Sequence, residues 1–174
     1  MNHETERGLH ISRLPLPHSP LAAAQARRHV REVLTTWGLG GGELAETVEL
    51  VASELVTNAV RHAVCPCGCT RGVIALALWC GDGRLRVEVG DPARTPPRWP
   101  EGVPDTEGCG GRGLAIVAAL GKEWGCYERP VRGKVVWCEF AASEGWAKGE
   151  AYAEGEGYAE SGRAVSSSAE STSE

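Results

Sequence analysis

Three polar side chains recur at intervals of four residues within the otherwise apolar stretch SELVTNAVRH, residues 53–62: Glu54, Asn58 and His62. Residues four apart on an α-helix differ by only about 40° around its axis, so the three side chains would form one ridge. A carboxylate can act as a general base, an amide oxygen can bind a metal ion, and an imidazole can donate or accept a hydrogen bond. This combination is typical of a site that handles an ion and a phosphate group.

The ridge is expected to lie along the face of its helix that is meant for burial. At about 100° per residue, the arc beside the ridge holds the apolar residues Leu44, Val48, Val51, Ala52, Leu55, Ala59 and Ala63. The solvated side should instead carry Glu46, Ser53, Thr57 and Arg61. Because an unpaired carboxylate or amide is costly to bury, the ridge must meet polar groups. These groups belong either to a ligand or, in the simpler alternative, to the backbone of neighbouring elements.

A second pattern is the glycine-rich stretch EGCGGRGL, residues 107–114, which precedes an apolar segment. A glycine-rich turn that opens a helix exposes backbone N–H groups at the positive end of the helix dipole, which favours phosphate. Gly108, Gly110 and Gly113 also satisfy G-x-G-x-x-G. A dinucleotide-binding fold would place that motif directly after a first strand, whereas here a long loop precedes it. The alternative is a flexible hinge followed by a core helix.

A third candidate is Asp91, which ends the apolar stretch RLRVEVGD directly before a Pro- and Gly-rich loop over residues 92–110. A carboxylate at this place can accept a hydrogen bond from an exocyclic amine such as that of adenine. Aspartates at strand ends are also common turn residues, so Asp91 alone indicates little.

The elements that must position these residues follow the order β-α-α-β-β-loop-α-β-β. HISRLPLP (residues 10–17) is expected to be an edge strand, because proline cannot pair centrally, and Ser19 before Pro20 is a typical helix start. GVIALALWC and RLRVEVGD are expected to form a hairpin through the turn GDG. GLAIVAALG predicts a short buried helix, and EWGCYER with GKVVWCEF a strand pair. The order predicts an α+β sandwich with helices on one face of a mostly antiparallel sheet.

Composition divides the chain into three parts: a flexible N-terminus over residues 1–8, a domain over 9–142 and a tail over 143–174. The tail is rich in Gly, Ala, Glu and Ser, and its seven acidic and two basic residues account for the whole formal charge of −5. Such a segment buries too little apolar surface to order itself, so we expect a disordered acidic tail. The rest of the chain is then neutral, which gives no basis for direct binding of nucleic acid.

The start of the chain and its cysteines predict a cytoplasmic protein. MNHETERGLH lacks the basic and apolar regions of a signal peptide, and no stretch is long and apolar enough to span a membrane. The seven cysteines are then expected to be reduced. Cys65, Cys67 and Cys69 lie in the stretch CPCGCT, and C-x-C-x-C spacing offers three thiols without an evident fourth zinc ligand. A redox or zinc sensor on this loop remains an outside alternative.

In chain order, ELVTNAVRH (54–62), VEVGD (87–91) and GRGLAIV (111–117) resemble the N, G1 and G2 boxes of the GHKL (Bergerat-fold) ATPases. The sequence is most similar to small bacterial anti-sigma factor serine kinases, which also tend to end in a strand like GKVVWCEF. The resemblance covers roughly Arg13 to Phe140. It implies a two-layer Bergerat-type sandwich with a mixed, mostly antiparallel sheet covered on one face by three helices.

The resemblance also implies a role for each box, with ATP and Mg²⁺ as cofactors. Glu54 would be the general base, Asn58 would bind Mg²⁺, Asp91 would hold the adenine amino group, and His62 would support Asn58. The backbone around Gly111 would cradle the phosphates, and residues 92–110 would be a lid over ATP. The implied ATP-binding set is Asn58, His62, Asp91, Gly108, Gly110, Gly111, Arg112, Gly113 and Leu114.

The implied function is an ATP-dependent serine/threonine kinase that phosphorylates an antagonist protein and sequesters a sigma factor, with a homodimer as a compatible assembly. Two positions depart from the family pattern. The G1 box usually reads D-x-G, whereas Asp91 is followed by Pro92 and Ala93, and Val135 stands where many relatives have threonine. The missing glycine favours weak nucleotide affinity. It leaves open an alternative function, a non-catalytic switch that binds a protein partner according to its nucleotide state.

Overall fold

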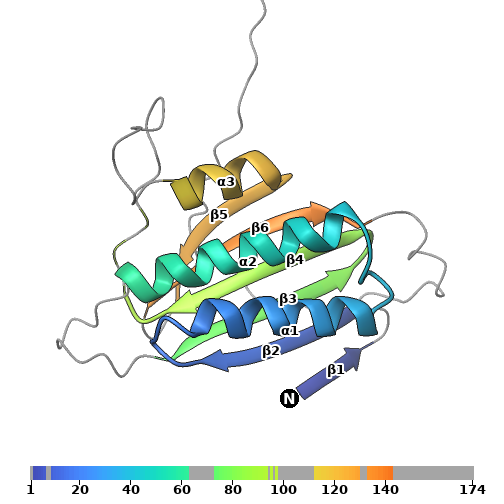
Figure 1. Ribbon diagram of the computed structural model, residues 1–174, viewed down its shortest axis with the longest axis horizontal. Helices are drawn as coiled ribbons and strands as arrows, with labels where there is room; N and C mark the ends of the chain where they lie inside the picture. Colours follow the sequence, from blue (N-terminus) through green and yellow to red (C-terminus); the bar gives the residue numbers. More distant parts are fainter. Residues whose placement is uncertain are drawn as a thin grey trace, which may run out of the picture.

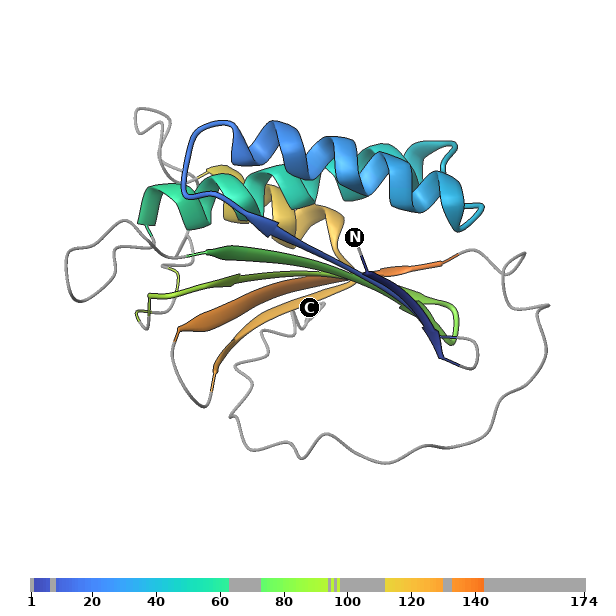
Figure 2. The same cartoon turned by 90° about the horizontal axis from the view of Figure 1, so that it is seen from below.

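The computed structural model describes residues 2–6, 9–62, 73–93, 95, 97, 112–129 and 133–142. The elements are β1 (Asn2–Glu6), β2 (Leu9–Leu16), α1 (Ala22–Thr36), α2 (Glu43–His62), β3 (Ile74–Gly81), β4 (Arg84–Asp91), α3 (Arg112–Leu120), β5 (Glu123–Glu128) and β6 (Lys134–Ala141). The strands form one sheet in the order β1-β2-β3-β4-β6-β5 (Figure 1). The three helices lie on one face of this sheet (Figure 2). The predicted α+β sandwich is confirmed.

The sheet is antiparallel at all of its described pairings. In β3 and β4 every second side chain is buried, as expected for strands with one face against a helical layer. The turn between them contains Asp82 and Gly83 with φ of 50° and 71°. Two successive residues with positive φ are typical of a tight hairpin turn that matches the twist of the strands, as the stretch GDG predicted.

The helix α2 packs between α1 and α3 over the centre of the sheet (Figure 1). Its core side consists of Ala45, Val48, Val51, Ala52, Leu55, Val56 and Ala59. Ser53, which we expected on the solvated side, is buried as well. Its hydroxyl accepts a 2.6 Å hydrogen bond from Arg27 of α1. The neighbouring helix therefore covers a side of α2 that the helical periodicity assigned to solvent.

Two expectations near the N-terminus, the edge position of residues 10–17 and the helix start at Ser19, were wrong in detail. The strand β2 is not an edge strand, because β1 pairs with its first half, up to Arg13 opposite Asn2. Pro15 lies beyond that pairing and is paired only with Ala75 of β3. Residues 2–6 thus form a strand within the segment that we expected to be flexible. The helix α1 begins at Ala22, and the Ser19 carbonyl, rather than its side chain, accepts the Ala22 N–H at 3.0 Å.

The helices of the described ranges include none that is long and apolar enough to cross a membrane. The tail over residues 143–174 lies outside the described residues, so its predicted disorder stays a prediction.

Candidate functional site

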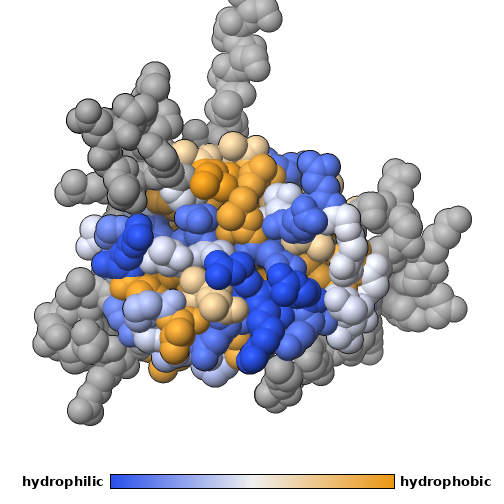
Figure 3. Space-filling model, viewed as in Figure 1, coloured by the Kyte–Doolittle hydropathy of each residue, from blue (hydrophilic) through white to orange (hydrophobic). Residues whose placement is uncertain are grey.

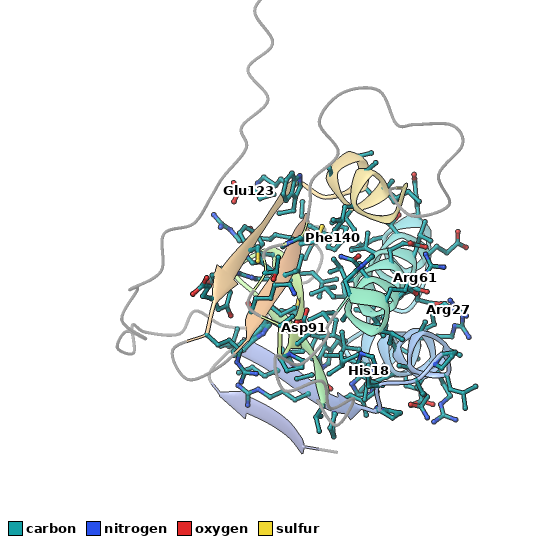
Figure 4. All side chains as sticks on the ribbon, turned by 90° about the vertical axis from the view of Figure 1, so that its left-hand side faces the viewer. His18, Arg27, Arg61, Asp91, Glu123 and Phe140 are labelled. Atoms are coloured by element: carbon teal, nitrogen blue, oxygen red, sulfur yellow. The ribbon has the colours of Figure 1, made fainter. Side chains whose placement is uncertain are left out.

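The candidate residues meet at one end of the sandwich, where α2 and β4 end and α3 and β6 begin (Figure 1). Figure 4 looks at this end and shows Asp91 between the strands and α2, with Arg61 on the last turn of α2. The antiparallel order β4-β6 and the packing of α3 on α2 bring these four termini together. Three segments far apart in the sequence therefore contribute to one region, as the three boxes predicted.

Glu54 of α2 lies directly against Gly113 at the start of α3. A Cβ atom built on Gly113 would be 3.7 Å from Glu54 Cβ, an ordinary contact, but only 2.7 Å from Glu54 Oε2, so any other residue requires the carboxylate to shift. Glu54 itself is half-buried. The polar ridge thus meets the glycine-opened helix, and this contact joins the first and second sequence patterns.

The rest of the ridge becomes more exposed toward the end of α2. Asn58 is half-buried and His62, the last residue of the helix, is exposed. In the described part of the chain the structure gives no hydrogen bond between the two side chains. Asn58 lies on α2 one turn beyond Glu54, toward the end of the helix. Support of Asn58 by His62 stays a prediction.

Asp91 is the last residue of β4 and is 4% exposed. Its Oδ1 atom accepts two hydrogen bonds, one from the Ala93 N–H at 2.8 Å and one from Lys134 Nζ at 2.9 Å. The bond to Ala93 closes a side-chain turn of the kind that aspartate favours. This bond fixes the position of Ala93, which stands where the family pattern D-x-G has its glycine.

Lys134 is a site residue that our sequence reasoning missed. It is the first residue of β6 and lies directly opposite Asp91 in the strand register. The pattern in GKVVWCEF indicated the strand but not its partner residues, because register between strands distant in sequence cannot be read from one strand alone.

The start of α3 is described from Arg112, followed by Gly113 and the buried Leu114. Backbone N–H groups in the first turn of a helix lack partners within the helix and favour anions. Gly108, Gly110, Gly111, most of the expected lid over residues 92–110 and the Cys65–Cys69 loop lie outside the described residues. The predicted contacts of these glycines with phosphate stay predictions.

The described thiols do not resemble a metal or redox centre. Burial raises the pKa of Cys80 to about 11 and that of Cys138 to about 12, and burial also raises the pKa of Cys126 to about 11. Such thiols stay protonated near neutral pH, whereas metal binding and nucleophilic attack need the thiolate. Within the described ranges, no group of three or more His, Cys, Asp or Glu side chains could hold a metal ion.

The chain is similar to known proteins both in sequence and in fold. The family described as histidine kinase-like ATPase domain matches residues 16–140. The crystal structure of the RsbU and RsbW domains of Rv1364c from Mycobacterium tuberculosis has a similar fold, with a TM-score of 0.51 and 23% sequence identity. That match covers 75% of this chain and 31% of the other. A search of the curated proteins gave no match.

Proposed function

The chain belongs to the histidine kinase-like ATPase domain family, and from this premise we propose that it binds ATP with Mg²⁺ at the end of the sandwich that holds Glu54, Asp91 and Gly113. The buried Asp91 carboxylate supports adenine recognition, because both of its hydrogen bonds in the described structure go to Oδ1 and leave Oδ2 for an exocyclic amine. Asn58 would supply an oxygen to Mg²⁺, which keeps several waters and needs few protein ligands.

We further propose that the bound ATP serves a protein serine/threonine kinase reaction. The observation that carries this proposal is the contact between Glu54 and Gly113, because it places a carboxylate beside the helix start that would hold the phosphates. Glu54 would accept the hydroxyl proton as the substrate oxygen bonds to the terminal phosphorus and ADP leaves. Phosphoryl transfer depends mainly on such positioning and on stabilisation of charge.

The proposed partners are an antagonist protein that is phosphorylated and a sigma factor that is sequestered, in the cytoplasm. This part rests on the resemblance to anti-sigma factor kinases and on a fold shared with a structure that contains an RsbW domain. The match covers only 31% of the chain in that structure, so the partners of the whole neighbouring protein are not transferred to this chain.

A second candidate, a nucleotide-dependent binding switch without kinase activity, is favoured by the turn after Asp91. Ala93 stands in place of the usual glycine, and its N–H donates a hydrogen bond to Asp91 Oδ1. A side chain at position 93 restricts how closely the backbone can approach a base. Weak nucleotide binding without transfer would agree with this turn.

Nucleotide binding is tested by calorimetry with Mg-ADP. We expect Asn58→Ala to weaken Mg²⁺-dependent binding, because it removes an oxygen ligand, and Asn58→Asp to retain it, because an oxygen remains. Gly113→Val should abolish binding by filling the helix start. Equal affinity in the wild type, Asn58→Ala and Gly113→Val would refute the proposed site.

Kinase activity is tested with labelled ATP and candidate antagonist proteins. Glu54→Gln is nearly isosteric, so it should leave nucleotide affinity close to that of the wild type while it slows transfer by roughly 10²-fold or more. Equal transfer rates would show that Glu54 is not the base. If neither form phosphorylates any antagonist but partner affinity follows nucleotide occupancy, the switch function is correct instead.

A further inference from the structure

Asp91 and Lys134 form an ion pair deep in the candidate site. Lys134 Nζ is 2.9 Å from Asp91 Oδ1, and the two side chains are only 5% and 3% exposed. Removing two opposite charges from water is costly, and their attraction offsets that cost only when their remaining hydrogen-bonding capacity is also used. The pair therefore needs further polar partners.

Both members of the ion pair have hydrogen-bonding capacity that the described structure does not use. An ammonium group has three N–H donors, and in the described structure Lys134 uses one of them, toward Asp91. Both hydrogen bonds to Asp91 are accepted by Oδ1, which leaves the lone pairs of Oδ2. A buried donor and a buried acceptor are thus held side by side, each with capacity for a ligand.

The strand register fixes the pair at the nucleotide end of the sandwich. Asp91 follows Leu85, Val87 and Val89 on the face of β4 that is covered by helices, and Lys134 lies directly opposite Asp91. Gly133, immediately before Lys134, has a φ of 89° and packs against the backbone carbonyl of Asp91. The ammonium group is therefore held by two strands rather than by a loop.

We propose that Lys134 is a second base-reading residue, which donates to the ring nitrogen N1 of adenine while Asp91 Oδ2 accepts from the N6 amine; this inference rests on the proposed nucleotide function. The adenine edge carries an N–H donor directly beside a nitrogen acceptor, which complements the acceptor and donor of the pair. Lys134 also confers specificity, because a base that lacks either group would leave a buried donor or acceptor of the pair without a hydrogen bond.

The test compares ADP with 1-deaza-ADP, in which a C–H group replaces N1, by calorimetry on the full chain. A hydrogen bond to a charged group predicts that the wild type binds ADP roughly 10- to 100-fold more tightly. Lys134→Met should lose most of this preference. Arg84→Met is the matched control, because Arg84 also joins β4 to β6 through an ion pair, with Glu139, and should keep the preference.

The outcomes separate the two proposals. If the wild type binds ADP and 1-deaza-ADP equally, the role of Lys134 is refuted while nucleotide binding stands. If the wild type binds neither, both proposals are refuted. Should Lys134→Met fail to fold, because Asp91 is left buried without its partner, the wild-type comparison still decides, and Lys134→Arg, which keeps a charged donor, should retain part of the preference.

Discussion

The close contact between Glu54 and Gly113 depends on the absence of a Cβ atom at position 113. Gly113 is the second residue of α3, and its φ is not in the positive region. An alanine is therefore compatible with the backbone there, and in a helix it is preferred over glycine by roughly 0.5–1 kcal/mol. A Cβ at position 113 would lie 2.7 Å from Glu54 Oε2, so an alanine is accommodated only if the flexible end of that carboxylate shifts.

We predict that Gly113→Ala displaces the Glu54 carboxylate without harming the fold. Phosphoryl transfer should fall by about 10-fold or more, because a small misplacement of a catalytic group is costly. The melting temperature should stay equal or rise slightly. The control is the double variant Glu54→Gln/Gly113→Ala, which should transfer no more slowly than Glu54→Gln alone. A further loss in the double variant would show that Gly113 acts independently of Glu54.

Among single residues, the sequence pointed to candidates that belong to one element, whose roles stay predictions, and it missed residues defined by contacts between elements. Glu54 and Asn58 follow from helical periodicity alone, and Asp91 from its place at a strand end. Lys134 and the buried Ser53 do not, because one depends on strand register and the other on a hydrogen bond from Arg27 of a different helix.

Among the elements, the β5–β6 connection has the tightest requirement. Gly133 has a φ of 89°, a region that L side chains rarely adopt, and a Cβ there would collide with the backbone carbonyl of Asp91. Its own carbonyl accepts the Arg129 N–H at 2.9 Å. This glycine therefore lets the chain directly before β6 approach the end of β4 closely.

We predict that Gly133→Ala destabilises the domain more than Gly83→Ala. Gly83 also has a positive φ, 71°, but nothing lies within 4 Å of a Cβ built on it. Gly83→Ala should therefore show only the backbone strain, about 1–2 kcal/mol, whereas Gly133→Ala adds a collision with backbone. Urea denaturation measures both free energies of unfolding. Equal losses would mean that the turn moves away from Asp91 at little cost.

The order of the elements was predictable because each one has a clear period or turn signal. The exception is β1, whose sequence NHETE contains no apolar alternation. Its pairing with β2 rests on backbone hydrogen bonds, which no side-chain pattern reports. Because β1 was not predicted from the sequence, its neighbour β2 was expected to be an edge strand.

At the scale of the whole molecule, the buried thiols of Cys80 and Cys138 and the half-buried thiol of Cys126, all within the described residues, make stability depend on pH in the alkaline range. The folded chain holds the thiol protons of Cys80 and Cys126 to about pH 11 and that of Cys138 to about pH 12, against an ordinary pKa of 9.0. Above pH 9 the unfolded chain releases these protons first, so the unfolded state binds fewer protons. The stabilisation is complete below pH 9 and is lost as the pH rises through the folded-state values.

We therefore predict that the free energy of unfolding falls steadily from pH 9 to pH 11. Urea denaturation at several pH values measures the slope. Cys138→Ala removes the thiol with the largest shift, so its slope should be shallower, although the variant starts from a lower stability because of the cavity. An unchanged slope would assign the alkaline loss to other groups.

The surface of the helical layer is divided by character. Figure 3 shows hydrophilic side chains over α1 and apolar ones over α3, where Leu120 is exposed. This division of the surface was not predictable, because the exposure of α3 depends on how far α2 covers it.

The family membership that the sequence resemblance predicted is confirmed by the match over residues 16–140.

The two outermost strands are also the shortest. β1 has five residues and β5 has six, whereas the four strands between them have eight each. β5 begins and ends with the exposed Glu123 and Glu128. Short edges that carry charge are poor templates for another chain. The β5 margin of the sheet is thus protected against edge-to-edge aggregation, and solubility at high concentration should depend on these two carboxylates more than on the net charge.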